Sequence, residues 1–176
     1  NVRGHLSNII QHRPNANGNL VPCNTWDNAT LTSDVVSQNQ SFPMIFSMKR
    51  IAPGHANTWF IRIMGTSFSV EYNTKYPKQI ATLDFEPGQS QGWKYVDLPY
   101  KSAYDTITGS IFEFGFSDSI LQMWAAFCDE LVHGKEMSQP FYCATPEEAL
   151  KTHYIFTAAL ESQKTAKTVP LHENNR

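Results

Sequence analysis

The chain has 176 residues, of which 41% are hydrophobic and 17% charged, the composition of an ordinary globular protein. The net charge of -2 and the pI near 6.3 give no electrostatic basis for binding nucleic acid. No apolar run approaches the roughly 20 residues that a membrane-spanning helix needs. We therefore expect one domain over residues 1–176, large enough to bury a core of its own.

The first two thirds of the chain carry the apolar patterns of β-strands. Strands are expected over 2–10, 29–36, 42–51, 58–64, 67–72, 79–85 and 93–98. In the clearest of them, Trp59, Ile61 and Ile63 share one face. A polar loop is expected over 12–19, and turn signals at Pro77 and 86–88 indicate that the later strands form an antiparallel meander.

The remaining third changes to helical periodicity. A wide apolar face predicts a helix over 118–133, with Ser117 as its cap and Gly134 as its end. A second helix is expected to begin at Thr145, because Glu148 stands three residues later and the pair forms a capping box. The chain then leaves this helix in extended form over 168–171.

Strands followed by helices, without βα alternation, predict an α+β fold. We expect a large, mostly antiparallel β-sheet with helices packed on one face. The other face, with aromatics such as Trp59 or Phe60, would then be free for oligomerisation. The segment 100–116 is expected to be an ordered loop that lines a site or contacts a partner.

The usual signatures of catalytic and metal sites are missing from the sequence. The six histidines form no HxxH or HExxH pair, and there is no GxSxG. Asp129 and His133 are four residues apart, which favours a surface contact along the first helix. Cys23 has no evident histidine partner, so an idle thiol is the simpler interpretation than a nucleophile. We expect no metal site and no catalytic residue.

Two short segments stand out as candidate binding residues. Lys49, Arg50 and His55 lie on a loop between two strong strands, where cations and a histidine gather at a sheet end. Trp26 and Asp27 combine an aromatic ring with a hydrogen-bonding side chain, a pair suited to a sugar-like ligand. A solvated hairpin loop and a turn leading into a strand account for the same residues without any ligand.

The number and spacing of the cysteines indicate the cellular compartment. Cys23, Cys128 and Cys143 are an odd number without CxxC spacing, which favours reduced thiols and a cytoplasmic protein. The sequons that begin at Asn28 and Asn39 would matter only in a secreted protein.

Four stretches, in order, resemble the C-terminal domain of the Gfo/Idh/MocA oxidoreductases, the family of glucose-fructose oxidoreductase and inositol dehydrogenase. The match covers nearly the whole chain. The first stretch is Val21-Pro22 with residues 25–29, and the second is 48–55 followed by 60–70, where Gly65 follows the strand. The third is the helix at 119–134, and the fourth is the closing segment 145–171.

The resemblance implies a two-domain enzyme. A Rossmann domain binds NAD(P), while the C-terminal sheet shapes the substrate pocket and mediates oligomerisation. Hydride passes between the nicotinamide and a hydroxyl-bearing carbon of a sugar or cyclitol, assisted by a lysine of an EKP-type motif and a histidine. This chain has neither GxGxxG nor EKP, so we expect the Rossmann domain to be missing and the fragment to be inactive and to bind no dinucleotide.

By position in the resemblance, Lys49, Arg50, His55, Trp26 and Asp27 would line the substrate in the full enzyme. Two other functions compete with this interpretation. One is a free-standing carbohydrate-binding β-module without catalytic activity, and the other is a hydrolase that uses Cys23 or a histidine.

Overall fold

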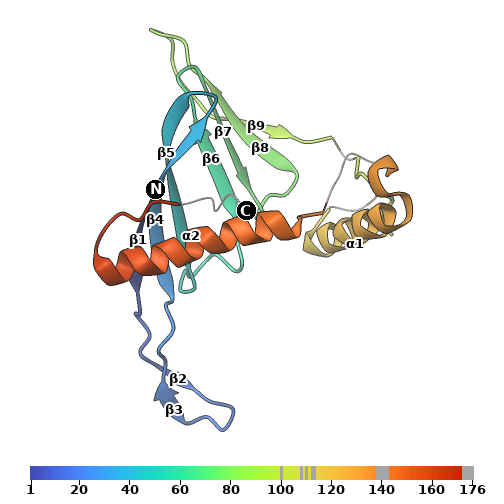
Figure 1. Ribbon diagram of the computed structural model, residues 1–176. Coiled ribbons are helices and arrows are strands. Elements are labelled where there is room, and N and C mark those ends of the chain that lie inside the picture. Colours follow the sequence, from blue (N-terminus) through green and yellow to red (C-terminus); the bar gives the residue numbers. More distant parts are fainter. Residues whose placement is uncertain (100, 108, 110, 112–113, 138–142, 172–176) are drawn as a thin grey trace. The chain divides into compact units, whose positions relative to one another are not determined.

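The computed structural model describes the chain except residues 100, 108, 110, 112–113, 138–142 and 172–176 (Figure 1). The chain divides into two compact units, one formed by Asn1–Gly54 with Ala144–Arg176 and the other by His55–Cys143. All the described strand pairs are antiparallel, and the two long helices follow the strands. The fold is therefore α+β, as the order of the sequence patterns predicts.

The first unit is built on a three-stranded sheet. β1 (Val2–Ser7), β4 (Asn28–Ser37) and β5 (Gln40–Lys49) lie in the order β1-β4-β5. β4 and β5 meet in a two-residue turn in which Gln38 and Asn39 both have positive φ, the requirement of a tight hairpin. The strands expected over 2–10, 29–36 and 42–51 are confirmed, with boundaries moved by a few residues.

A second hairpin of this unit corrects the expected polar loop at 12–19. β2 (His12–Pro14) pairs with β3 (Leu20–Pro22). At the tip, the Asn15 Oδ1 atom accepts hydrogen bonds from the backbone N–H groups of Asn17 and Asn19, each at 3.0 Å. Strands of three residues are too short to show an alternating pattern. The polar residues between them therefore predict a loop and not a hairpin.

Helix α2 (Pro146–Thr165) packs on the sheet at β1. Its capping box forms as predicted, since the Glu148 N–H donates to Thr145 Oγ1 at 3.2 Å and the Thr145 N–H donates to Glu148 Oε2 at 2.8 Å. Figure 1 shows the helix running across the strands of this unit. The core of the unit lies between them and consists of Val2, Leu31, Ala158 and Ala159, packed against Phe46, Ile155 and Val169.

Three backbone N–H groups on the outer edge of β1 are hydrogen-bonded to the C-terminal part of the chain. The Val2 N–H donates to the Val169 carbonyl oxygen at 2.8 Å, the Gly4 N–H to Ser162 Oγ at 3.0 Å, and the Leu6 N–H to Gln163 Oε1 at 2.8 Å. A free strand edge would be open to pairing with other chains. Helix α2 and the extended segment after it therefore close this edge, and the extended exit expected over 168–171 is confirmed at Val169.

The second unit contains a four-stranded meander. β6 (Phe60–Met64), β7 (Phe68–Asn73), β8 (Gln79–Asp84) and β9 (Lys94–Asp97) lie in sequence order. This confirms the predicted meander. The register places seven apolar side chains on one face of the sheet: Ile61, Ile63, Phe68, Val70, Tyr72, Ile80 and Val96.

Helix α1 (Phe116–His133) also belongs to the second unit. It ends at Gly134, as predicted, where φ is +58°. The expected cap at Ser117 is wrong, because Gly115 is the N-cap and its N–H donates to Asp118 Oδ2 at 2.8 Å. The acidic residue three positions after Gly115 thus fixes the start of the helix, and Ser117 lies inside the first turn.

Of the loop expected over 100–116, residues 100, 108, 110 and 112–113 lie outside the described part of the chain. Over the residues that the structure describes, no helix is long and apolar enough to cross a bilayer.

Candidate functional site

A hollow in the first unit brings together four of the five residues predicted to line a ligand. Its volume is about 360 Å³, within the roughly 300–1,000 Å³ typical of small-molecule sites. The hollow is lined by Trp26, Asp27, Asn28, Ala29, Met48, Lys49 and Arg50.

The pairing of β4 with β5 places these residues side by side. Asn28 lies opposite Lys49, and Ala29 lies opposite Met48, at the end of the ladder. Beyond the ladder, the Arg50 N–H donates to the Asp27 carbonyl oxygen at 2.8 Å. The hairpin therefore holds two segments that lie about 20 residues apart in the sequence against each other.

Asp27 is buried, with 3% of its surface exposed, and its carboxylate is held by backbone donors. The Ile10 N–H donates to Oδ2 at 2.8 Å, and the Ile9 N–H donates to the same carboxylate at 3.0 and 3.1 Å. These hydrogen bonds, with a smaller contribution from the Arg13 charge, hold the pKa of the Asp27 carboxyl below its usual value. Asp27 is thus an ionised anchor for the 9–10 segment as well as part of the lining.

The other three predicted residues are open to solvent. Trp26 is 50% exposed, and Lys49 and Arg50 are exposed as well. Within the described residues, neither cation forms an ion pair. An aromatic ring and two cations therefore border the hollow.

His55 is not among the residues that line the hollow. It belongs to the second compact unit, which begins at this residue. The loop predicted to carry Lys49, Arg50 and His55 is thus divided between the two units, and the hairpin brings only Lys49 and Arg50 to Trp26 and Asp27.

The base of the β2–β3 hairpin holds a polar cluster that the sequence does not reveal. Cys23 Sγ lies 3.2 Å from Thr25 Oγ1. Hydrogen bonding from Thr25, with a smaller contribution from Arg13, lowers the pKa of the Cys23 thiol. Two nitrogen atoms of the Arg13 guanidinium, Nε and Nη2, are buried without a hydrogen-bond partner.

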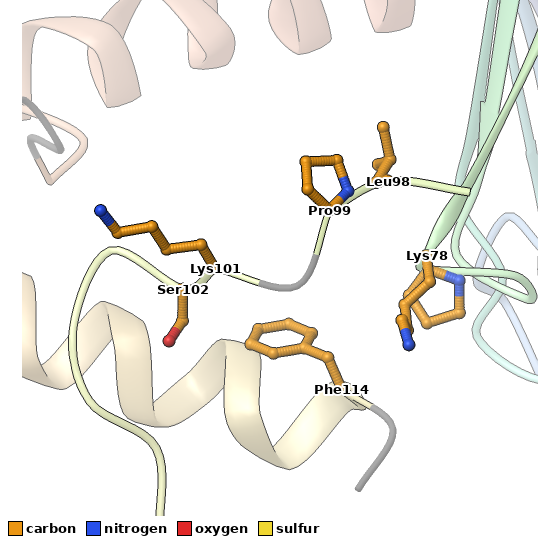
Figure 2. Close-up of a pocket in the computed structure, with 7 residues that line it drawn as sticks. Lys78, Leu98, Pro99, Lys101, Ser102 and Phe114 are labelled. Atoms are coloured by element: carbon orange, nitrogen blue, oxygen red, sulfur yellow. The ribbon is translucent and has the colours of Figure 1, made fainter. Parts of the chain in front are cut away.

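A smaller hollow lies in the second unit (Figure 2). Its volume is about 170 Å³. Figure 2 shows the Phe114 ring between Ser102 and Lys78, while the Lys101 side chain points away from the ring. The remaining lining residues are the apolar Pro77, Leu98 and Pro99. None of the predicted binding residues contributes to it, and its polar lining residues are Lys78, Lys101 and Ser102.

A third cluster joins helix α1 to the segment before it. The predicted contact between Asp129 and His133 forms, with Oδ1 and Nδ1 2.6 Å apart. Its expected surface position is wrong for Asp129, which is buried at 8% exposure, whereas His133 is exposed. The Tyr104 hydroxyl donates to Asp129 Oδ2 at 2.9 Å, and Gln122 exchanges two hydrogen bonds with the Tyr104 backbone at 2.8 and 2.9 Å.

Burial and the Asp129 carboxylate raise the pKa of Tyr104 to about 12, so this hydroxyl keeps its proton at neutral pH and is a weaker acid than usual. The cluster therefore ties a loop to a helix. Sequence reasoning missed Tyr104 because it lies 18 residues from Gln122 along the chain.

No group of three or more histidine, cysteine, aspartate or glutamate side chains is arranged to hold a metal ion in the part of the chain that the structure describes.

The sequence matches no protein-family model and no curated protein at a significant level. The structure, in contrast, is similar to several solved oxidoreductases. An oxidoreductase domain protein from Kribbella flavida superposes with a TM-score of 0.71 at 16% identity, over 98% of this chain and 44% of that one. An NAD binding oxidoreductase from Klebsiella pneumoniae gives a TM-score of 0.73 at 15% identity, over 98% of this chain and 45% of that one.

Levoglucosan dehydrogenase in complex with NADH and L-sorbose gives a TM-score of 0.73 at 17% identity, over 97% of this chain and 44% of that one. The chain shares their fold. It spans less than half the length of each of these proteins. At such low identity the likeness concerns architecture, and function must be argued from the site.

Proposed function

We propose that this chain is the substrate-binding and oligomerisation domain of an NAD(P)-dependent dehydrogenase of the Gfo/Idh/MocA type, with residues 1–176 as that single domain. The observation that carries the proposal is the fold: 97% of the chain superposes on a dehydrogenase whose structure holds NADH and L-sorbose. The substrate would be a sugar, a cyclitol or a related hydroxyl compound.

The hollow at the end of the β4–β5 ladder is the proposed place of contact with this substrate. Trp26 offers a ring on which the apolar face of a sugar can lie, and Asn28 offers an amide that both donates and accepts hydrogen bonds. Lys49 and Arg50 add donors, and Asp27 fixes the segment that carries Trp26. His55 keeps its proposed role only if the complete enzyme brings it to the same substrate.

NAD or NADP would bind to the part of the parent enzyme that this chain does not span. The chain covers about 44% of the similar oxidoreductases and contains no GxGxxG sequence. The glycines of that motif allow the backbone to approach the pyrophosphate closely. The isolated chain is accordingly proposed to be inactive.

The apolar face of the β6–β9 sheet is the proposed oligomer interface. Ile61 and Ile63 are each 58% exposed and Val96 is 47% exposed in the described chain. Exposed apolar surface of this kind is typical of contacts between subunits. Phe60, one of the aromatics expected to contribute, alternates to the opposite face from Ile61 and Ile63.

We also propose that the protein is located in the reducing cytoplasm. Cys23, Cys128 and Cys143 form no disulfide with one another.

An assay of the full-length parent enzyme tests the proposed function. We expect NAD+ or NADP+ to be reduced, with growth of absorbance at 340 nm, when a panel of sugars, cyclitols, sugar acids and sugar phosphates is offered. The isolated chain should show no change in NADH fluorescence on titration. Dinucleotide binding by the isolated chain would contradict the proposal. Carbohydrate binding by a parent that reduces no dinucleotide would favour the binding-module alternative.

A further inference from the structure

The base of the β2–β3 hairpin, labelled in Figure 1, holds buried polar atoms that lack a partner. In the part of the chain that the structure describes, the buried side-chain nitrogen and oxygen atoms without a hydrogen bond are Arg13 Nε, Arg13 Nη2 and Asn8 Oδ1. Buried polar atoms in proteins are almost always paired. Three unpaired atoms from two residues of the same hairpin base therefore indicate a group that this place is built to receive.

Cys23 lies next to both of these residues. The Asn8 side-chain amide donates to the Cys23 carbonyl oxygen at 2.7 Å, and the Cys23 N–H donates to the Gln11 carbonyl oxygen at 2.7 Å. Arg13 pairs with Val21 across the β2–β3 ladder, so Arg13 and Cys23 are diagonal neighbours on one face. Long side chains reach such diagonal neighbours. The backbone of Cys23 is thus fixed beside the Arg13 guanidinium.

The surroundings of the thiol favour its reactive form. Thr25 Oγ1 lies 3.2 Å from Cys23 Sγ, and hydrogen bonding from Thr25, with a smaller contribution from Arg13, lowers the pKa of the thiol. The thiolate is the form of cysteine that attacks electrophiles and is oxidised. Cys23 is partly exposed, so a small solute can reach the sulfur.

The unpaired atoms comprise two donors and one acceptor. Nε and Nη2 are adjacent N–H donors of the guanidinium, and neither is hydrogen-bonded to the Cys23 sulfur. A hydroxyl attached to that sulfur offers what is missing, because its oxygen accepts from Arg13 and its O–H donates to Asn8 Oδ1. A water molecule offers the same atoms without any reaction at sulfur, and it is the alternative that an experiment has to separate.

We propose that Cys23 is a redox modification site at which hydrogen peroxide converts the thiol to a sulfenic acid held by Arg13 and Asn8. The thiolate attacks one peroxide oxygen, so that an S–O bond forms while the O–O bond breaks. Sulfur is oxidised by two electrons and the peroxide is reduced. The leaving hydroxide takes up the proton that the thiol released and becomes water. A thiol reductant reverses the change.

Peroxide treatment of the reduced 176-residue chain tests this assignment. Dimedone traps sulfenic acids, and mass spectrometry of the peptides locates the adduct. We expect Cys23 to be labelled about tenfold faster than Cys128. Cys128 is the internal control because it is the exposed thiol, so that access alone would favour it. Reduction with a thiol before dimedone is added should abolish the label.

Variants separate the charge of Arg13 from its paired donors. R13Q removes the charge and should slow both peroxide oxidation and iodoacetamide alkylation of Cys23 by about three- to tenfold. R13K keeps the charge, so alkylation should stay within about twofold of the natural chain, while the sulfenic acid should decay faster for want of the two adjacent donors. The matched control is K151Q with K164Q, which removes two exposed cations of helix α2 in the same unit and should change neither rate.

Two results would overturn the proposal. One is labelling of Cys23 no faster than that of Cys128, which would leave a water molecule as the partner of the unpaired atoms. The other is an unchanged oxidation rate of Cys23 in a folded R13Q variant. If R13Q does not fold, T25V carries the same test, since it removes the hydroxyl beside the sulfur and nearly keeps the size of the exposed Thr25 side chain. Unchanged oxidation in T25V would then contradict the proposal.

Discussion

At the residue scale, Asp27 shows how one side chain serves both fold and site. It lies in the hollow, yet its carboxylate is committed to the Ile9 and Ile10 N–H groups. Because those donors favour the charged form, protonation weakens the hydrogen bonds that hold Ile9 and Ile10 at Asp27. The geometry of the hollow thus depends on the charge of Asp27.

The pH dependence of stability follows from the sign of this shift. The pKa of Asp27 is lowered in the folded chain from its usual value of 3.8, so the folded state binds the proton less readily than the unfolded state. The stabilisation is present in full above the unfolded pKa and is lost as the pH falls through the folded pKa. We expect D27N to lower the free energy of unfolding at pH 7 and to flatten its decline below about pH 4.

Denaturant unfolding at several pH values measures this effect. D34N is the matched control, since Asp34 is an exposed residue of strand β4, which directly follows Asp27, and it should leave the unfolding midpoint unchanged at pH 7. An unfolding free energy of D27N equal to that of the natural chain at pH 7 would show that the Asp27 hydrogen bonds do not hold the segment.

Residue patterns alone predict the cap at Thr145 and the contact between Asp129 and His133, because both depend on partners three or four positions away. They do not predict that Asp129 is buried. They do not predict that Asp27 anchors Ile9 and Ile10, since that contact spans 17 or 18 residues. For the same reason Tyr104 was missed. Local spacing determines local contacts, and side chains that meet through tertiary structure leave no periodic trace.

At the scale of elements, the contact between β1 and helix α2 depends on one missing side chain. A Cβ atom at Gly4 would lie 2.6 Å from the Ala159 carbonyl oxygen and 3.1 Å from the Ala159 Cα atom. Both are backbone atoms of the helix and cannot move aside as a flexible side chain can. The same approach lets the Gly4 N–H reach Ser162 Oγ.

We therefore expect G4A to reduce the free energy of unfolding by about 1–3 kcal/mol, the usual cost of overpacking. Chemical denaturation measures it. G92A is the control, because a Cβ atom there meets nothing within 4 Å, and it should be neutral or slightly stabilising. Equal stability of G4A and G92A would show that α2 does not sit this closely on β1.

The strand and helix order was predictable from the sequence, whereas the β2–β3 hairpin was not. The long strands β4 and β5 and the meander β6–β9 carry enough apolar residues for their periodicity to show. β2 and β3 have three residues each, and their pairing depends on the Asn15 turn and on contacts at the base such as that of Asn8 Nδ2 with the Cys23 carbonyl oxygen. Trp26, Asp27, Lys49 and Arg50 lie together because β4 and β5 pair at the ends next to these residues. His55 is not with them, because it is the first residue of the other compact unit.

At the scale of the whole molecule, the chain superposes almost completely on less than half of several oxidoreductases. We propose that this portion recognises the substrate and that the rest of the parent binds the dinucleotide. A substrate-binding domain without a cofactor motif has a clear kinetic consequence. A mutation in the hollow should change the KM for the hydroxyl substrate and leave the KM for the dinucleotide unchanged.

The most direct test is therefore the steady-state kinetics of the parent enzyme carrying W26A, with K151Q and K164Q together as the matched control. We predict that W26A raises the KM for the hydroxyl substrate by about two- to tenfold, since it removes ring packing, and leaves the KM for NAD(P)+ unchanged. A rise in the KM for NAD(P)+ instead, or no change in either constant, would contradict the assignment of this chain to substrate binding.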